Sequence, residues 1–225
     1  MSLDWQDLFP HIAHDVRALV RKGLSNAQFL EKRLAPITDP EIAGHIRAII
    51  ESQRDLSNLF VRLVTLVEAL PGVPRSGVDD FVPLEVAFLG AKNECGEAMM
   101  REGVELESNP FPDCNVPRKT QVVLRELIEN SLRFREPSRT LRISIEAKEH
   151  SGRLSVRITD NGVGVDHTYA NGLFQPFQRM DARRSGFGLG LAISRAIVEG
   201  AGGSIYLETS GAGAVFVFEL PVVLV

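Results

Sequence analysis

Two glycine-rich runs, 161–164 and 186–190, have the composition that lets backbone approach a ligand closely. The first run follows residues 153–159, which alternate like a strand, and the second opens onto residues 191–198, which have helical spacing. A strand, two glycine turns and a helix N-terminus could together cradle the phosphates of a nucleotide. Neither run fits a dinucleotide-binding fingerprint or a Walker A loop, because the required glycine spacing and the Gly-Lys-Ser/Thr ending are absent.

A third feature lies upstream of both glycine runs. Glu126 and Asn130 are four residues apart, so they share one face of a predicted helix. Val123, Leu127 and Leu132 can face a core while this polar face points into a site. The sequence therefore predicts that a polar helix face and two glycine turns form one binding site.

In their order and spacing these motifs resemble the ATP-binding domain of sensor histidine kinases, within the gyrase, MutL and histidine kinase superfamily. The similar motifs are the N box (Glu126-x-x-x-Asn130), the G1 box (Asp160-x-Gly162-x-Gly164), the F box (residues 173–179) and the G2 box (Gly186-x-Gly188-x-Gly190). The residues from Asn130 to Arg135 and the short lid look most like the kinases of bacterial phytochromes. The resemblance covers nearly the whole chain.

The resemblance implies that this domain binds ATP with Mg²⁺. Asn130 would be the metal ligand, because an amide oxygen is a hard, neutral ligand that suits a Mg²⁺ held mainly by phosphates and water. Asp160 would accept a hydrogen bond from the adenine amino group. Arg133 stands where these kinases often carry a lysine, and Arg133 and Arg179 would bind the phosphates. Arg179 has an alternative interpretation as part of a solvated lid face.

The other implied ATP-binding residues belong to the glycine runs. They are Gly162, Gly164, Gly186, Gly188, Leu189 and Gly190. Glu126 is a candidate catalytic residue with two interpretations. In gyrase-like ATPases a glutamate at this place positions the attacking water, whereas in the kinases a polar residue assists the Mg²⁺ shell or phosphoryl transfer.

Ahead of these motifs the sequence predicts two long helices, over about residues 4–34 and 41–70, with apolar residues at spacings of three and four. The proline-containing residues 35–40 form the turn between them, so the helices make an antiparallel hairpin. Because two helices alone bury little apolar area, we expect a homodimer in which two hairpins form a four-helix bundle.

On the first helix, His14 followed by Asp15 resembles the phosphoacceptor motif of histidine kinases. The resemblance implies that His14 is phosphorylated, since a neutral imidazole can attack the γ-phosphate without first losing a proton. Asp15 could orient the ring. A histidine alone on a helix would otherwise be a solvated or satisfied side chain. Leu19 replaces the proline usual in the family, which implies a straighter helix and leaves the phosphatase activity of such kinases open.

The predicted fold is therefore a chain of two domains. Residues 1–70 form the all-α hairpin, 71–80 a Pro- and Gly-containing linker, and 81–225 the ATP-binding domain. Successive strands with helices on one side predict an α+β sandwich for the second domain, of the gyrase, MutL and histidine kinase type by resemblance. Its expected helices span residues 85–103 and 118–134, and its expected strands span 104–107, 141–146, 153–159, 204–208 and 214–220.

Composition excludes several other classes of protein. The 25 basic and 29 acidic residues give a net charge of −4, which argues against nucleic acid as the main partner. The two cysteines form neither a disulfide framework nor a metal-binding spacing. No apolar run could span a bilayer and no signal peptide opens the chain, so we expect a cytoplasmic protein. No sensor domain lies within these residues, so we expect a fragment of a longer protein or an input from another chain.

The first interpretation is an ATP-dependent protein-histidine kinase of a two-component system. It would phosphorylate His14 and pass the phosphoryl group to an aspartate in the receiver domain of a response regulator. The alternative is a degenerate kinase-like phosphorelay or regulatory binding protein with this fold, which Leu19 and Phe187 favour. A gyrase-class ATPase or an anti-sigma serine kinase is a third interpretation, and the hairpin with His14 and Asp15 argues against it.

Overall fold

The chain folds into two compact units, Met1–Glu68 and Ala69–Val225, in the computed structural model. The structure describes residues 5–34, 39–70, 80–165, 172–179, 186–208 and 213–222, with the backbone alone for residues 5–15, 17, 31 and 34. Most of the predicted turn at 35–40 and of the predicted linker at 71–80 lies outside the described residues.

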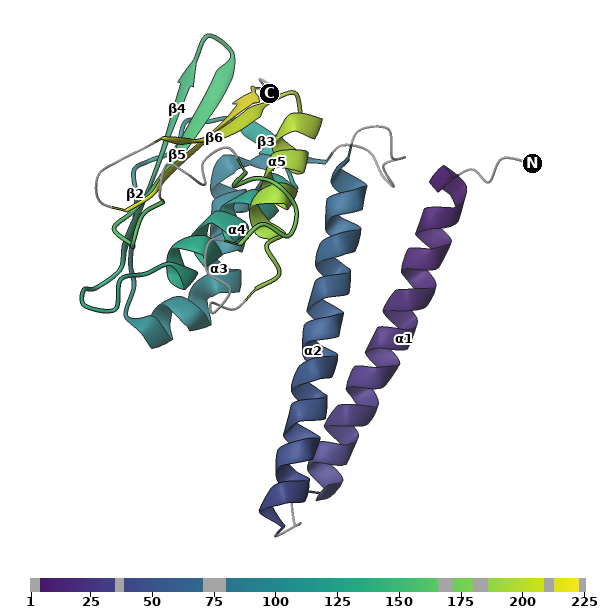
Figure 1. Ribbon diagram of the computed structural model, residues 1–225. Coiled ribbons are helices and arrows are strands. Elements are labelled where there is room, and N and C mark those ends of the chain that lie inside the picture. The colour runs from purple at the N-terminus through teal and green to yellow at the C-terminus, as the bar shows by residue number, and fades with distance from the viewer. Residues whose placement is uncertain are drawn as a thin grey trace. The chain divides into compact units, whose positions relative to one another are not determined.

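The first unit is a hairpin of two helices, α1 (Trp5–Leu34) and α2 (Pro40–Ala69), as predicted (Figure 1). Asp39 caps the start of α2, because its Oδ1 accepts a hydrogen bond from the backbone N–H of Glu41 at 2.9 Å. Although each helix has 30 residues, neither these nor the other described helices are long and apolar enough to cross a membrane.

The two helices of the hairpin bury one apolar stripe and leave another exposed. Among the side chains that the structure describes on these helices, the buried apolar ones are Val20, Ala27, Ile50, Val64 and Ala69. The exposed stripe lies on α2, where three apolar residues follow one another at intervals of seven. They are Ile42, Ile49 and Leu56, which are 46%, 57% and 50% exposed. A single hairpin therefore does not cover its own apolar surface.

The second unit is built on a five-stranded sheet with the strand order β2-β4-β5-β7-β6. Its strands are β2 (Glu105–Ser108), β4 (Arg142–His150), β5 (Arg153–Asp160), β6 (Ser204–Glu208) and β7 (Val215–Pro221). Strand β2 pairs with β4 in parallel, and the other neighbouring strands pair antiparallel. Strand β5 and the first half of β4 alternate buried and more exposed side chains, so one face of the sheet is covered there.

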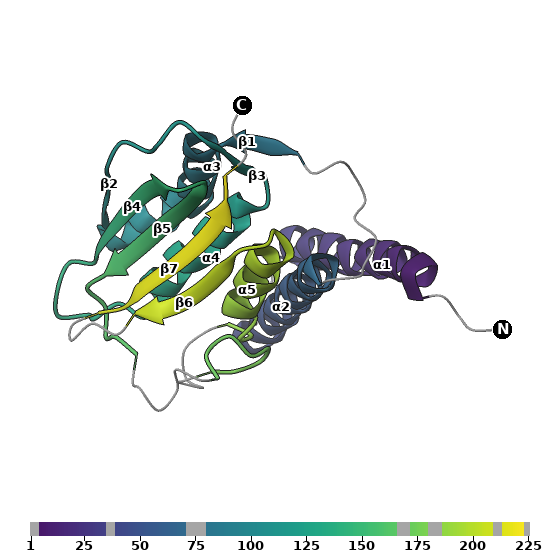
Figure 2. The same cartoon turned by 90° about the horizontal axis from the view of Figure 1, so that it is seen from above.

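Three helices cover that face of the sheet, as Figure 2 shows. They are α3 (Leu84–Glu102), α4 (Thr120–Arg133) and α5 (Gly190–Gly200). The core between the two layers contains fully buried apolar side chains from both, among them Leu124, Leu127, Ile145, Val156, Ile193 and Phe218. This layering confirms the predicted α+β sandwich.

A small sheet was not predicted from the sequence. It pairs β1 (Phe81–Pro83) antiparallel with β3 (Asn115–Pro117). Each strand has three residues and includes a proline, so neither is long enough to show an alternating pattern, and proline is unusual inside a strand. The other elements lie within a few residues of their predicted bounds.

Candidate functional site

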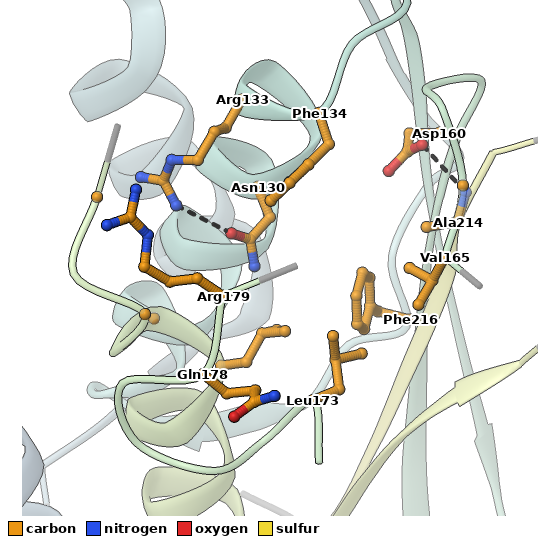
Figure 3. Close-up of a pocket in the computed structure, with 15 residues that line it drawn as sticks. Asn130, Arg133, Phe134, Asp160, Val165, Leu173, Gln178, Arg179, Ala214 and Phe216 are labelled. Carbon is orange, nitrogen blue, oxygen red and sulfur yellow. Dashed lines mark hydrogen bonds between the residues drawn. The ribbon is translucent and has the colours of Figure 1, made fainter. Parts of the chain in front are cut away.

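The second unit contains a pocket, partly open to solvent, between α4, the end of β5, the 172–179 segment and the start of α5 (Figure 3). Its lining residues are Asn130, Arg133, Phe134, Asp160, Gly164, Val165, Leu173, Gln178, Arg179, Gly186, Gly188, Gly190, Leu191, Ala214 and Phe216. Eight of the ten residues predicted to bind ATP are in this set. Gly162 and Leu189 are the two that do not line the pocket.

Asp160, the last residue of β5, is held at one side of the pocket by three hydrogen bonds. Its Oδ1 accepts from the backbone N–H of Gly162 at 2.9 Å and of Ala214 at 3.1 Å. Its Oδ2 accepts from Oγ of Ser131 at 2.8 Å. The carboxylate is 7% exposed, so these donors compensate for its burial and orient it. It can accept a further hydrogen bond from an amino group of a ligand in the pocket.

Gly162 positions this part of the site although it does not line the pocket. The backbone N–H of Val163 donates to the carbonyl oxygen of Phe134 at 2.9 Å, which ties the turn after β5 to the end of α4. A Cβ at residue 162 would lie 2.5 Å from that same oxygen. Only glycine lets the two segments approach so closely.

Asn130 and Arg133, on the last turn of α4, lie at the other side of the pocket (Figure 3). Nη1 of Arg133 donates to Oδ1 of Asn130 at 3.2 Å. Asn130 is 8% exposed, and its buried Nδ2 has no hydrogen-bond partner among the described residues. Arg179 lines the pocket on this side as well. This side therefore offers two guanidinium groups and an amide, which are groups that bind phosphate oxygens.

The second glycine run begins beside Arg133 and leads into α5. Gly186 has a φ of +115°, and a Cβ there would lie 3.0 Å from Cζ of Arg133. The guanidinium group thus packs against the backbone of the run. Helix α5 begins at Gly190, which lines the pocket, so its N-terminal N–H groups lie at the pocket. A helix N-terminus favours an anion.

Glu126, the predicted catalytic carboxylate, does not line the pocket. It is 1% exposed, and its Oε1 accepts a hydrogen bond from Nη2 of Arg125 at 2.8 Å. Arg125 also donates to Oε2 of Glu94 on α3 at 3.1 Å. Cys95 on α3 lies close enough to these charged groups to be affected by them. Burial and the carboxylate of Glu129 raise the pKa of its thiol to about 12. Glu126 is therefore part of the α3–α4 interface.

His14, the predicted phosphoacceptor, and Asp15, its predicted orienting residue, belong to α1. The structure describes the backbone of these two residues but not their side chains. His45 is exposed on α2. Among the described residues no group of three or more His, Cys, Asp or Glu could hold a metal ion. The candidate metal ligand in the pocket is Oδ1 of Asn130.

The sequence did not indicate the apolar lining of the pocket. Val165, Leu173, Ala214 and Phe216 supply it, and Phe174 packs edge-on against Phe216 with the ring centroids 6.4 Å apart. Ala214 and Phe216 both lie in the predicted strand 214–220, but an alternating pattern does not distinguish a side chain in a pocket from one in the core. Ser131 was also missed, because a serine on a helix has no spacing that reveals its partner.

Comparison with known proteins gives concordant matches. Residues 115–224 match the family of histidine kinase-, DNA gyrase B- and HSP90-like ATPases. Cyanobacterial phytochrome A of Nostoc sp. is 29% identical over 222 residues, which are 95% of this chain and 28% of that protein. Phytochrome-like protein Cph1 of Synechocystis sp. is 26% identical over 222 residues, which are 95% of this chain and 29% of that protein. The chain spans less than a third of the length of these relatives.

Solved structures share the arrangement of elements. Full-length ShkA in complex with AMPPNP superposes with a TM-score of 0.78 at 22% identity, over 97% of this chain and 46% of that one. The histidine kinase AdeS of Acinetobacter baumannii has a TM-score of 0.62 at 18% identity, over 92% of this chain and 97% of that one. At these identities the likeness concerns the fold, and it includes both the hairpin and the sandwich.

Proposed function

We propose that this chain transfers the γ-phosphoryl group of ATP to His14 and then to an aspartate of a response regulator. The chain is the core of a two-component sensor histidine kinase and contains an ATP-binding domain. The observation that carries this proposal is the chemistry of one pocket. A buried carboxylate lies at one side of it, and two guanidinium groups with an amide lie at the other. That polarity matches a nucleotide, which has an amino-bearing base at one end and phosphates at the other.

The adenine end of the nucleotide would bind at Asp160. The three donors from Gly162, Ala214 and Ser131 orient the carboxylate at the side of the pocket where Val165 and Phe216 lie. A carboxylate accepts from the amino group of adenine, whereas guanine presents an acceptor at the matching position, so Asp160 would select adenine. Leu173 and Phe216 supply apolar surface for the ring.

The phosphate end would bind at Asn130, Arg133 and Arg179, next to the N-terminus of α5. Oδ1 of Asn130 fits a Mg²⁺ that is held mainly by phosphates and water, because one neutral oxygen is then enough from the protein. Bound there, Mg²⁺ would neutralise charge on the β- and γ-phosphates. Arg133 and Arg179 would orient the same phosphates through hydrogen bonds from their guanidinium groups.

His14 would be the acceptor on α1. An imidazole nitrogen forms a bond to the γ-phosphorus as the bond to the β–γ bridging oxygen breaks, and ADP leaves with the electron pair. Asp15 would accept a hydrogen bond from the N–H on the other side of the ring and so orient the attacking nitrogen. For Glu126 the pairing with Arg125 favours a positioning role within α4 over direct activation of water.

A homodimer through the hairpins and a response regulator as the phosphoryl acceptor complete the proposal. The exposed stripe of Ile42, Ile49 and Leu56 supports the dimer, because a second hairpin would cover it.

The alternative is a regulatory or phosphorelay protein that binds ATP without transferring its phosphoryl group. Leu19 supports this alternative, because it stands where the family places a helix-kinking proline. Helix α1 continues through Leu19 from Trp5 to Leu34.

The test is incubation of the full chain with Mg²⁺ and radiolabelled ATP, beside His14→Ala and, as a matched control, His45→Ala. We expect acid-labile, base-stable label on the parent and on His45→Ala, and none on His14→Ala. Label retained on His14→Ala would show that the acceptor is another residue. ATP binding without label on any of the three proteins would favour the alternative.

A further inference from the structure

The first glycine run, 161–164, is hydrogen-bonded to the segment that joins α4 to β4, residues 134–141, and to the first residue of β4. Asn161 makes two of these bonds with its side-chain amide. Its Oδ1 accepts from the backbone N–H of Arg142 at 2.8 Å, and its Nδ2 donates to the carbonyl oxygen of Thr140 at 3.0 Å. The amide thereby continues the pairing of β4 with β5 beyond their last paired residues.

Arg139 holds the next part of the same run. Its Nη2 donates to the carbonyl oxygen of Gly162 at 2.8 Å. The N–H of that same peptide group belongs to Val163, and it donates to the carbonyl oxygen of Phe134 at 2.9 Å. Because a peptide group is planar, hydrogen bonds at both of its ends fix its orientation.

Gly162 connects these bonds to the carboxylate in the pocket. Its backbone N–H is one of the donors to Oδ1 of Asp160, at 2.9 Å. Glycine has no Cβ to restrict its own backbone, so the orientation of this donor depends on what holds the residues around it. Arg139 and Asn161 supply part of that restraint, and neither of them lines the pocket.

We infer that Arg139 and Asn161 are positioning residues for base recognition, because they hold the first glycine run so that the carboxylate of Asp160 faces the amino group of adenine. This inference rests on the proposed function and names two residues outside the pocket on which the choice of base depends. A hydrogen bond weakens steeply when its direction changes, so a small movement of the run should cost selectivity for the base. The contacts with the phosphates should change much less.

The experiment compares two nucleotides of equal charge. Calorimetric titration of the full chain in Mg²⁺ measures the dissociation constants of ATP and of purine riboside triphosphate, in which hydrogen replaces the amino group of adenine. The ratio of the two constants reports the contact of that amino group, because the sugar and the phosphates are identical. For the parent we expect purine riboside triphosphate to bind roughly tenfold or more weakly, as for the loss of a hydrogen bond to a charged group.

Arg139→Ala should lower this ratio by about threefold or more, although the loss of its charge weakens both nucleotides. Arg142→Ala is the matched control, because it removes an equal charge beside the same glycine run. The guanidinium group of Arg142 pairs with Glu105 on β2, and the backbone N–H that donates to Asn161 remains in this variant. The control should keep the ratio of the parent.

Asn161→Ala tests the other set of bonds independently. Its two side-chain hydrogen bonds lie at exposed positions, so the variant should fold, and thermal unfolding checks this. We expect its ratio to fall as that of Arg139→Ala does. A purely structural or electrostatic role would weaken both nucleotides equally and leave the ratio unchanged. An unchanged ratio in Arg139→Ala would overturn the role of Arg139, and an unchanged ratio in Asn161→Ala would overturn that of Asn161.

The remaining outcomes separate this inference from the proposed function. If the parent binds the two nucleotides equally well, selection of the base by Asp160 is overturned and this inference with it, while phosphoryl transfer to His14 can still be correct. If the parent binds neither nucleotide, both proposals are overturned.

Discussion

Asp160 illustrates how single residues prepare this site. Its carboxylate is nearly buried, yet each of its oxygens accepts at least one hydrogen bond from the protein. Two of the three donors are backbone N–H groups, which no substitution except one to proline removes. The third is the hydroxyl of Ser131, one residue beyond Asn130 on α4. Among the described residues, Ser131 is therefore the one whose side chain donates a hydrogen bond to the carboxylate of Asp160.

We predict that Ser131→Ala lowers the free energy of unfolding by about 2 kcal/mol, because a buried hydrogen bond to a charged group is lost. ATP affinity should fall too, since one oxygen of Asp160 is no longer oriented. Chemical denaturation and calorimetric titration measure the two effects. Ser194→Ala is the control, because that hydroxyl is also buried but donates to the carbonyl of Gly190 in its own helix. If Ser131→Ala and Ser194→Ala lost equal amounts of unfolding free energy and of ATP affinity, a specific role for the Ser131–Asp160 bond would be contradicted.

At the scale of elements, α4 connects the pocket to the rest of the sandwich. One side of the helix presents Asn130 and Arg133 to the pocket, and another presents Arg125 to α3. Arg125 pairs with Glu94 across the helix interface and with the buried Glu126 beside it. The position of the last turn of α4 therefore depends on an ionic cluster that lies outside the pocket.

We predict that Arg125→Ala destabilises the second unit by about 3 kcal/mol, because it removes the cation that pairs with the 1% exposed carboxylate of Glu126. Arg118→Ala is a matched control, since its pair with Asp80 is more than half exposed on both sides and should contribute less than about 1 kcal/mol. Denaturant unfolding followed by circular dichroism measures both variants. A loss for Arg125→Ala as small as that for Arg118→Ala would show that the cluster contributes little.

The two units of the molecule differ in how much of their apolar surface they bury within one chain. The sandwich has its own core between the sheet and the three helices, so it can bury its apolar side chains within one chain. The hairpin cannot, because Ile42, Ile49 and Leu56 remain about half exposed along one stripe of α2. A repeat of seven residues is the spacing with which helices of a bundle pack against each other. A second copy of the hairpin would therefore complete the first unit.

We predict that Ile49→Asp converts a dimer, of twice the chain mass of 24.8 kDa, into a monomer, because the interface would have to bury a charge. ATP binding should persist, since the pocket lies within the second unit. Sedimentation equilibrium measures the mass. Arg47→Asp, at an exposed position off the stripe, should leave the dimer intact. An unchanged mass for Ile49→Asp would exclude this stripe as the interface.

Much of this organisation follows from the sequence, because it depends on neighbours along the chain. Spacings of three and four predicted α1, α2, α3 and α4 to within a few residues, and alternation predicted the long strands. The glycine runs and the pair of Glu126 and Asn130 predicted the elements that form the pocket. These patterns are local, so they can be read without knowing which segments meet.

The tertiary structure decided which groups face each other. Ala214 donates to Asp160 across 54 residues of sequence, and Ser131 reaches it from 29 residues away. The pairing of Glu126 with Arg125, which leaves that carboxylate outside the pocket lining, depends on how α4 packs against α3. The orientation of the Asn130 amide depends on where the guanidinium group of Arg133 lies. Such contacts arise only when distant segments pack together, because periodicity specifies which face of an element is apolar but not what that face meets.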